Sequence, residues 1–582
     1  MKKLLVYLKD YKKECVLAPL FKLLEASFEL IVPLVMAAII DRGIAVSDKR
    51  SIFAWGGVLV LLAVVGLTCS VTAQYFAAKA AVGFSTKLRY ALFSHIESLS
   101  FSELDMVGTS TLITRMTSDI NQVQSGVNMV LRLFLRSPFI VFGAMIMAFT
   151  VNIKAALIFV VTIPLLSIVV FGIMLLSIPL YKKVQSGLDA VLSHTRENLS
   201  GARVIRAFNK EEEETAVFGE RNDSLANLQM VVGRISTLMN PLTLILINVA
   251  TLLVIWIGGK EVYMGVITRG EVVALVNYMS QILVELVKLA NLIILINKAL
   301  ACGNRISEVF EVKPSITTAS NKAASEDSHS DDCHENAVVF SHVSMSYQGA
   351  SEETLSDIDF VVKKGETIGI IGGTGSGKSS LVHLIPRFYD VTKGAVLVNG
   401  TDVRDYEIGT LRDKIGIVMQ KAVLFQGTIA DNLRWGKPDA TEEEMWRALE
   451  IAQATDVVKG KEGELGYVVE QGGKNLSGGQ RQRLTIARAI VKDPEILILD
   501  DSASALDFAT DAKLRAALKG LKDKTVFIVS QRTSSIQHAD RIVVLDDGEA
   551  VGIGNHQELL QSCDVYREIY ESQFKKEDRK EA

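Results

Sequence analysis

The fold of the C-terminal half is decided by the stretch Gly372-Gly373-Thr374-Gly375-Ser376-Gly377-Lys378-Ser379. Glu366 to Ile371 before it reads as a buried strand, and Ser380 to Ile385 after it reads as the opening of a helix. The spacing G-x-x-x-x-G-K-S between a strand and a helix is that of a P-loop. Its glycines let backbone N–H groups curl around phosphates, and the helix N-terminus adds its positive end. We expect Lys378 to neutralise the β- and γ-phosphates and the Ser379 hydroxyl to ligate Mg²⁺.

A second stretch supplies the acidic group that such a site needs. The four apolar residues Ile496 to Leu499 lead directly to Asp500, as expected of a central parallel strand that ends at the site. Asp500 is predicted to bind the Mg²⁺ indirectly, by a hydrogen bond to one of the ligands of the ion. Together the two stretches predict an α/β P-loop domain that binds a nucleotide's phosphates with Mg²⁺.

The N-terminal half has a different character. Of the 582 residues 49% are hydrophobic and the mean hydropathy is +0.28, values that indicate a membrane portion. Apolar stretches long enough to cross a bilayer lie near 17–40, 52–78, 130–151, 155–180, 241–262 and 272–300. Before them, Met1 to Glu14 carries five lysines and an apolar stripe at helical spacing, which predicts an amphipathic helix on the membrane surface.

The loops between the predicted spans give an orientation. Two long segments, after spans two and four, are rich in Lys and Arg, whereas the alternate loops are short. With the lysine-rich N-terminus, these segments predict a multi-pass protein of the cytoplasmic membrane whose N-terminus and C-terminal domain lie in the cytoplasm. Apolar positions at heptad-like spacing continue through Leu88, Leu92, Ile96 and Leu99, so the spans should extend as helices beyond the membrane and touch the nucleotide domain with their tips.

The predicted fold class is therefore multidomain. An all-α six-helix transmembrane domain covers 1–311, a polar linker covers 312–335, and an α/β P-loop cassette with a helical subdomain covers 336–582. The net charge of −4 offers no basic face for a nucleic acid, so no nucleic-acid partner is expected. Five scattered cysteines without a CxxC pair favour neither a disulfide framework nor a zinc site.

The cassette resembles the ATP-binding cassette (ABC) family. The resemblance rests on the stretch Leu476-Ser477-Gly478-Gly479-Gln480-Arg481-Gln482-Arg483, which matches the family signature. The resemblance implies that Ser477, Gly478, Gly479 and Gln480 contact the ATP of the opposite subunit, and that Asp507, in the D-loop match Ser504 to Asp507, does so too. It also implies that Tyr347 stacks on adenine and that Gln420 joins the magnesium site to the membrane domain. Glu470 sits where the family has an acidic coupling residue.

Two positions depart from the family pattern. After Asp500 the family has a glutamate that activates the attacking water, and this chain has Asp501. Near the end of the next strand the family has a switch histidine, and this chain has Gln531. The aspartate is one methylene shorter, and an amide has neither a titratable proton nor a positive charge. Both losses concern hydrolysis, whereas Lys378 and Ser379, which bind nucleotide, are intact.

The resemblance covers essentially the whole chain. Segments such as GTSTLITRMTSDI and ENLSGARVIRAFNKEEEE look like the cytoplasmic extensions of bacterial multidrug-type half-exporters. The joint departures resemble one subunit of a heterodimeric exporter in which one composite ATP site is degenerate. The implied partner is a second, non-identical half-transporter, and hydrolysis would occur mainly at the site that this chain's signature completes. The alternative is that both substitutions are tolerated in a working homodimer.

The cargo is less well defined than the machinery. Glu25 and Glu29 lie four apart on one face of the first span, with Lys22 one turn before. One reading is a local ion pair near the cytoplasmic interface. The other is that Glu29, with Glu285 of the last span, gives a cavity an acidic lining suited to cationic amphiphilic drugs. Export of a lipid or a peptide, or a channel or sensor gated by ATP, are the other functions that the sequence leaves open.

Overall fold

The computed structural model describes residues 2–316 and 335–574, and these residues form two compact units. The first unit comprises Met1–Glu97 and Ser110–Val312. The second comprises Ser98–Thr109 and the described residues from Lys313 onward. The predicted boundary near 311 is close to this division, but the segment Ser98–Thr109, which the sequence placed in the membrane domain, groups with the cassette. Most of the predicted linker, residues 317–334, lies outside the described residues.

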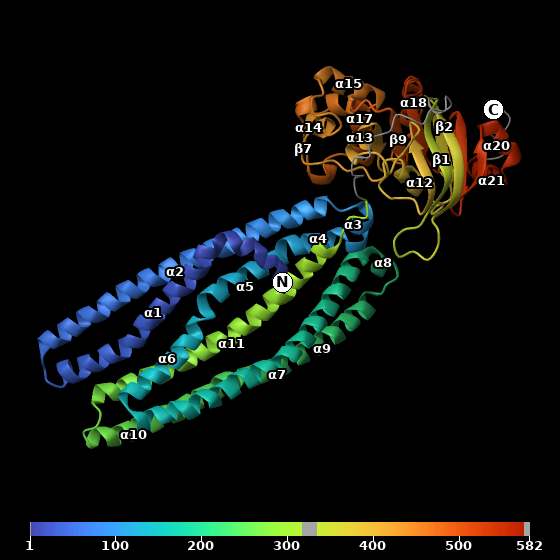
Figure 1. The fold of residues 1–582 in the computed structure, drawn as a ribbon. Helices are drawn as coiled ribbons and strands as arrows, with labels where there is room; N and C mark the ends of the chain where they lie inside the picture. Colours follow the sequence, from blue (N-terminus) through green and yellow to red (C-terminus); the bar gives the residue numbers. More distant parts are fainter. Residues whose placement is uncertain (1, 317–334, 575–582) are drawn as a thin grey trace. The chain divides into compact units, whose positions relative to one another are not determined.

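Long helices build the first unit, and six segments of the described chain are long and apolar enough to cross a membrane (Figure 1). In chain order its elements are η1 (Lys2–Tyr11), α1 (Lys12–Ala38), η2 (Ile39–Ile44), α2 (Lys49–Glu97), α4 (Thr109–Thr114), η3 (Arg115–Asp119), α5 (Ile120–Leu133), α6 (Arg136–Val151), α7 (Ile153–Ser200), α8 (Ala202–Ala207), α9 (Glu211–Thr237), α10 (Met239–Tyr263) and α11 (Arg269–Glu311). The six spans are confirmed. The predicted extension of the second span is confirmed as well, because α2 runs for 49 residues without a break.

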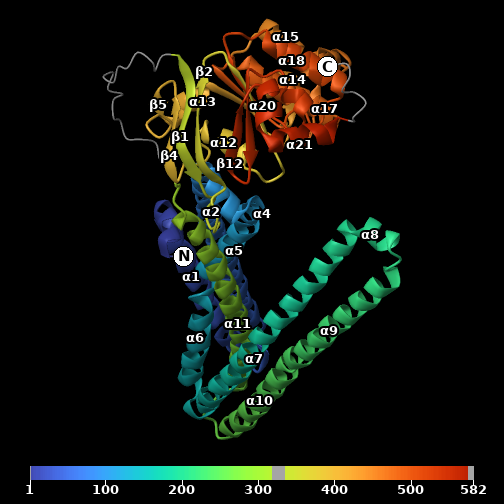
Figure 2. The same ribbon diagram turned by 90° about the vertical axis from the view of Figure 1, so that its right-hand side faces the viewer.

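Small residues let the helices of this unit approach each other. Ala73, Ala77, Ala80 and Ala81 of α2 are buried, and α1 contributes Ala18 and Ala26 to the interior. In a membrane, where burial of apolar groups gives little drive, such small side chains allow close backbone packing. Figure 2 shows α7 and α9 running side by side toward α8 and diverging from the other helices of the unit.

The second unit is built on three sheets. Their strand orders are β2-β1-β4-β5, β12-β11-β3-β10-β9-β6 and β7-β8. The strands are β1 (Asn336–Met345), β2 (Leu355–Lys363), β3 (Thr367–Gly372), β4 (Lys393–Val398), β5 (Thr401–Asp402), β6 (Ile415–Val418), β7 (Gly427–Thr428), β8 (Val468–Val469), β9 (Ile496–Asp500), β10 (Thr525–Val529), β11 (Arg541–Asp546) and β12 (Glu549–Gly554). In the six-stranded sheet only the β11–β12 pair is antiparallel. The predicted α/β class is confirmed.

Helices complete this unit. Near the P-loop and the parallel sheet lie α3 (Phe101–Val107), α12 (Lys378–Leu384), α13 (Ile408–Asp413), α18 (Phe508–Lys519), α19 (Thr533–Ile536), α20 (His556–Ser562) and α21 (Asp564–Gln573). The expected helical subdomain contains α14 (Ile429–Arg434), α15 (Glu442–Ile451), α16 (Thr455–Lys459), η5 (Glu464–Gly466), η6 (Gln471–Gly473) and α17 (Gly478–Val491). It shares an apolar core, including Met445, Leu449 and Leu484, with one face of β9 and β10.

The register of the parallel strands brings their carboxyl ends together. Val529 of β10 lies beside Ile370 of β3 on one side and beside Asp500 of β9 on the other. The loops that follow these three strands therefore open at one edge of the sheet, which is where ligands bind in open α/β folds. At the opposite ends of the strands, Arg541 Nη2 donates to Glu366 Oε2 at 2.8 Å and ties β11 to the start of β3.

Candidate functional site

The loop between β3 and α12 has the backbone that a phosphate cradle needs. Gly375 and Gly377 both have φ +89°, in the left-handed region that a side chain disfavours. A Cβ on Gly377 would also lie 2.7 Å from the Leu355 side chain. The helix begins at Lys378, two residues before the predicted start, so Lys378 and Ser379 both lie in its first turn. The N–H groups of this turn have no partner within the helix and are free to meet an anion.

Lys378 and Ser379 point toward the end of β9. The Lys378 ammonium donates to Gly372 O at 3.0 Å and also to Gly373 O. Burial lowers the pKa of this ammonium, and the Asp501 and Asp500 carboxylates act in the opposite direction. A cation buried against backbone carbonyls can exchange these neutral partners for charged phosphate oxygens, which form stronger hydrogen bonds.

The residues predicted to hold magnesium lie together. Ser379 Oγ donates to Asp500 Oδ1 at 2.8 Å, and Asp500 is only 1% exposed. The other oxygen of Asp500 faces His383 Nε2 of α12 at 3.4 Å. A hydroxyl next to a buried carboxylate is an all-oxygen donor set of the kind that Mg²⁺ prefers, so these residues fit the ion. His383 was not singled out from the sequence, because a histidine in a helix carries no signal without its neighbour in space.

Asp501 follows the strand in a left-handed conformation, with φ +45°. Its backbone N donates to Val529 O at 3.0 Å, which fixes the residue at the mouth of the sheet edge. Its carboxylate Oδ2 lies 3.5 Å from Gln420 Nε2, at the outer limit of a hydrogen bond. Burial raises the pKa of Asp501 above the ordinary aspartate value, and Asp500 adds to this effect against Gln420 and Lys378.

Gln531 follows β10 and is exposed. Its backbone carbonyl accepts a hydrogen bond from Gln573 Nε2 at 2.7 Å, so α21 holds the backbone at this position. The amide side chain lines the same pocket as Asp501. An amide in this place can donate or accept a hydrogen bond, but it cannot carry a proton away.

One pocket of about 340 Å³ joins most of the predicted ATP site. Its lining comprises Tyr347, Thr354, Thr374, Gly375, Gly377, Lys378, Ser379, Ser380, Gln420, Asp500, Asp501, Val529, Ser530 and Gln531. Tyr347 is anchored at its hydroxyl, which lies 2.8 Å from Ser380 Oγ, and its ring packs edge-on against Tyr389 at 5.1 Å. Of the other P-loop residues, Gly372 and Ser376 are buried and Gly373 is exposed, and none of the three lines this pocket.

The signature residues form a separate surface. Ser477 caps α17, because its Oγ accepts from Gln480 N at 3.3 Å while Gln480 Oε1 accepts from Ser477 N at 3.0 Å. Gly478 and Gly479 form the first turn of α17, and a Cβ on Gly479 would lie 3.0 Å from Ala505 O. Asp507 caps α18 by accepting from Thr510 N at 2.9 Å. Neither Ser477 nor Asp507 lines the pocket of this chain's own P-loop.

Comparisons with known proteins agree with this geometry. Residues 15–286 match the family model described as the ABC transporter transmembrane region, and residues 355–504 match the model described as ABC transporter. An uncharacterized ABC transporter ATP-binding protein of Mycobacterium tuberculosis (strain ATCC 25618 / H37Rv) is 37% identical over 97% of each chain. The chain belongs to the ABC transporters. It joins a transmembrane and an ATP-binding domain in the arrangement of the half-transporter type, and it is a multi-pass membrane protein with an ATPase domain.

Two further comparisons place this ABC transporter more closely. A putative multidrug export ATP-binding/permease protein of Bacillus subtilis (strain 168) is 35% identical and covers 99% of this chain and 98% of its own length. Among solved structures, a bacterial Atm1-family ABC exporter with ATP bound has a TM-score of 0.76 over 97% of this chain and 98% of that chain. Its sequence identity is 22%, so this second likeness concerns the fold.

The short helix α3 of this ABC transporter packs on the cassette close to the ATP site. The Phe101 ring lies 4.4 Å from that of Phe388, and Tyr389 OH donates to Asp105 Oδ2 at 2.7 Å. Burial raises the pKa of Tyr389, and the Asp105 carboxylate adds to the effect, so the phenol stays a donor. Tyr389 also touches Tyr347, and thus α3 is two side chains away from the ATP pocket.

In the membrane domain, the predicted residues Glu29 and Glu285 lie in one cluster, and the sequence reading missed its centre. Arg136 Nη1 donates to Glu285 Oε1 at 2.7 Å, and Arg136 Nη2 donates to Glu29 Oε2 at 2.7 Å. An arginine inside a predicted span is costly without a partner, and this signal was available in the sequence. Glu25 is engaged elsewhere, in the local ion pair with Lys22 that the sequence allowed.

This cluster borders a cavity of about 380 Å³ between α1 and α11. Its lining residues are Glu29, Val32, Pro33, Met36, Asn277, Ser280, Gln281, Val284, Glu285 and Lys288. Glu29 and Glu285 lie about 15 residues from the short-loop ends of their helical segments, about 22 Å along a helix and therefore inside a hydrocarbon core of about 30 Å. Intramembrane charges beside a cavity are candidates for contact with cargo.

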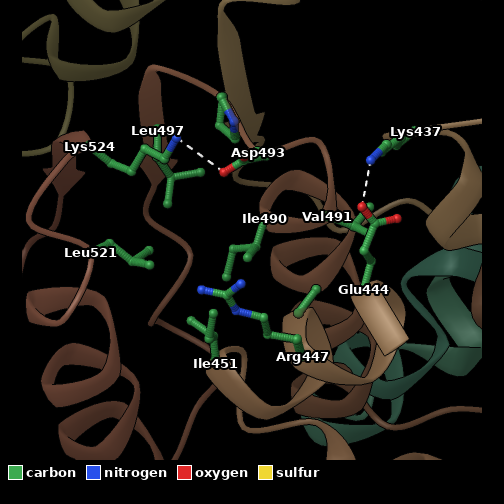
Figure 3. A pocket seen from close by; sticks show the side chains of 12 residues that line it. Lys437, Glu444, Arg447, Ile451, Ile490, Val491, Asp493, Leu497, Leu521 and Lys524 are labelled. Carbon is green, nitrogen blue, oxygen red and sulfur yellow. Dashed lines mark hydrogen bonds and ion pairs between the residues drawn. The ribbon is translucent and has the colours of Figure 1, made fainter. Parts of the chain in front are cut away.

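A further pocket of about 150 Å³ lies in the cassette, between α15, the end of α17 and β9 (Figure 3). Figure 3 shows the Arg447 side chain reaching across it near Ile451 and Ile490, with the ion pairs Lys524–Asp493 and Lys437–Glu444 at its rim. Leu497 of its lining belongs to the strand that leads to Asp500, but the pocket shares no lining residue with the ATP pocket. It is therefore distinct from the ATP site.

Proposed function

We propose that this chain is one half of a heterodimeric exporter that moves a small hydrophobic or amphiphilic compound across the cytoplasmic membrane, with its N-terminus and cassette in the cytoplasm. In this proposal its own P-loop site retains ATP more than it hydrolyses it. Its signature completes the active site of a second, non-identical half-transporter. The likeness to a putative multidrug exporter of similar length supports the direction and kind of transport.

The observation that carries the proposal is the position of the Asp501 carboxylate. Lys378 and the Ser379–Asp500 pair, which we expect to bind the nucleotide, lie at the same sheet edge, and Mg²⁺ bound there would neutralise phosphate charge. The Asp501 carboxylate, by contrast, only reaches Gln420 at 3.5 Å, and Gln531 offers an amide where a proton-carrying group is needed. Binding without efficient water activation is the expected result.

In this proposal, ATP is hydrolysed mainly at the site that this chain's signature completes with the partner's P-loop. Ser477 is held as the cap of α17, with the backbone N–H groups of Gly478 and Gly479 behind it. A helix N-terminus of this kind stabilises the negative charge of a phosphate brought to it by a second cassette. ATP binding then favours the state in which the two cassettes are joined, and hydrolysis at the partner's site releases it.

The coupling to the membrane helices would run through α3. Its contacts with Phe388 and Tyr389 link the ATP pocket to a segment that continues directly into α2 on one side and α4 on the other. A change at the pocket that moves Tyr389 would therefore be felt by both helices.

Two variants of this chain in the purified pair test the proposal. Ser477→Arg places a bulky cation against the partner's ATP and should abolish ATPase activity. Asp501→Asn removes the carboxylate of this chain's own site and should change the activity by less than about twofold. Without its partner, this chain should show little ATPase activity, whether or not it carries one of these substitutions. Rapid ATP turnover by the lone chain, or equal losses from the two variants, would contradict the proposal.

The two alternative functions predict different results in the same assays. A homodimeric lipid or peptide exporter would show rapid turnover without a second chain and ATP-dependent movement of that cargo. A channel or sensor gated by ATP would show flux without substrate-stimulated hydrolysis. ATP-dependent uptake of a fluorescent amphiphile into inverted vesicles that contain the pair is the outcome expected for the exporter.

A further inference from the structure

Four charged side chains of the membrane domain form a linear chain of alternating sign. Glu29 pairs with Arg136 at 2.7 Å, Arg136 pairs with Glu285 at 2.7 Å, and Glu285 pairs with Lys288 at 2.8 Å. Ser137 Oγ donates to the second oxygen of Glu285 at 2.7 Å. The order along this ionic chain is thus minus, plus, minus, plus, and its formal charges cancel.

The two inner members are committed to the protein, whereas the two outer members are accessible. The side chains of Arg136 and Glu285 are 9% and 3% exposed, and both oxygens of Glu285 already accept hydrogen bonds. The side chains of Glu29 and Lys288 are 38% and 42% exposed. One carboxylate and one ammonium therefore remain to meet a ligand, at opposite ends of the ionic chain.

Both accessible ends line the cavity between α1 and α11. Because the helices run in opposite directions along it, Glu29 and Lys288 lie at one end, and the uncharged part, with Val32 and Met36, extends away from them. The Gln281 side chain also lines the cavity, and its Oε1 is buried without a hydrogen-bond partner among the described residues. Beyond its charged end the cavity thus has an apolar wall on α1 and, on α11, the polar residues Asn277, Ser280 and Gln281, the last with an unused acceptor.

We propose that this cavity binds a zwitterionic amphiphile, with the cationic group of the ligand on Glu29, its anionic group on Lys288 and its tail along Val32 and Met36. The inference rests on the proposed function, whose cargo class it narrows. Such a ligand places a positive charge on Glu29 and a negative charge on Lys288, so that the two outer charges of the ionic chain each gain a second partner of opposite sign. The shared chemistry fits a zwitterionic lipid headgroup or a zwitterionic compound from solution.

The same geometry weakens the case for a purely cationic cargo. Glu29 and Glu285 would form an acidic lining only if they were unpaired, and Arg136 lies between them. A lone cation on Glu29 would compete with Arg136 and would also lie near Lys288. A lone anion on Lys288 would compete with Glu285 in the same way. In a low-dielectric site each uncompensated charge is costly, which favours the ligand that brings both signs.

Binding to the full chain in nanodiscs tests the inference. The probes are three fluorescent amphiphiles with the same tail and a phosphocholine, trimethylammonium or sulfate head. We expect the phosphocholine probe to bind roughly tenfold more tightly than either singly charged probe, the gain of one additional charge-assisted contact. A trimethylammonium probe that binds most tightly, with sulfate the weakest, would overturn the inference in favour of an acidic cavity.

Three variants assign the effect to the ionic chain. Lys288→Met should abolish the preference for phosphocholine and favour the trimethylammonium probe, whereas Glu29→Gln should favour the sulfate probe. Both side chains are accessible, and the inner pair of Arg136 and Glu285 stays intact, so the fold should survive. Glu25→Gln is the matched control: it removes the same charge one turn away, outside the cavity lining, and should leave the ranking unchanged. An unchanged ranking in both Lys288→Met and Glu29→Gln would refute the assignment.

The source of the ligand is separated by the bilayer. If a membrane lipid occupies the cavity, phosphatidylcholine in the nanodisc should compete with the phosphocholine probe. The probe should then bind more weakly in phosphatidylcholine nanodiscs than in phosphatidylglycerol nanodiscs that hold the same amount of probe in the bilayer. If the ligand comes from solution, the two should agree. The binding assay uses this chain without its partner and without hydrolysis, whereas transport is measured with the purified pair. Headgroup preference in binding without ATP-driven transport by the pair would refute the proposed function alone. Transport by the pair without the headgroup preference would refute the inference alone.

Discussion

Restoring a glutamate at Asp501 and a histidine at Gln531 should turn the retaining site into a hydrolytic one. The Asp501 carboxylate lies 3.5 Å from Gln420 Nε2, against about 2.9 Å for a well-formed hydrogen bond. One methylene extends its reach by about 1.5 Å, which covers this gap. A misplacement of about 1 Å at a reacting centre costs about 10²-fold in rate, or ~2.7 kcal/mol of barrier. We therefore expect the double variant to hydrolyse about 10²-fold faster at this site.

The assay must observe this site alone. In the purified pair, Ser477→Arg silences the composite site that contains the partner's P-loop, so residual hydrolysis reports the P-loop of this chain. Asp501→Glu with Gln531→His is added to that background, and single-turnover release of phosphate is measured. Lys378→Met should abolish the gained activity, because it removes phosphate binding. A double variant that still binds ATP but gains no hydrolysis would refute the geometric explanation.

Three other predictions concern single contacts. Arg136→Met should destabilise the membrane domain by about 3–5 kcal/mol, since it breaks the buried ion pair with Glu285 and leaves that buried carboxylate only the half-exposed Lys288 as a charged partner, and adding Glu285→Met should recover most of the loss in thermal unfolding. Burial raises the pKa of Glu366, but the hydrogen bonds from Arg541 and from the Lys363 N–H, with the charges of both residues, together outweigh burial and set the pKa below the ordinary 4.5; the cassette should therefore lose stability as the pH falls through that lowered pKa, and Glu366→Gln should remove this step from acid-unfolding curves. Tyr389→Phe should keep basal ATPase activity but reduce its stimulation by substrate, because it removes the hydrogen bond to Asp105; full stimulation would exclude this route.

Much of the cassette could be predicted because its signals are local. The strand, loop and helix around Gly372 to Ser379 lie next to each other in the sequence, and the structure differs from the expected bounds by only one or two residues. The serine-to-glutamine spacing at Ser477 likewise indicates a helix start. The register that places Asp500 beside Val529 could be anticipated only in outline, since it depends on the order of strands in the sheet.

The rest depends on contacts between distant segments. The sequence predicted that the tips of the extended spans touch the nucleotide domain, but it could not show that α3 groups with the cassette or which residues it meets, because Phe388 and Tyr389 lie far along the chain. The pairing of Glu29 and Glu285 through Arg136 joins three helices, so the sequence could supply the charges but not their neutralisation. The presence of Arg136 in an apolar predicted span was nevertheless a reason to expect an acidic partner for it.

The fate of ATP at each site of the assembled pair tests the central claim most directly. The pair is allowed to turn over a photoreactive ATP that carries a label on either the α- or the γ-phosphate, and is then cross-linked and separated into its two chains. We predict that this chain retains both labels, as intact triphosphate, while the partner retains only the α-label. Loss of the γ-label from this chain as fast as from its partner would contradict the account.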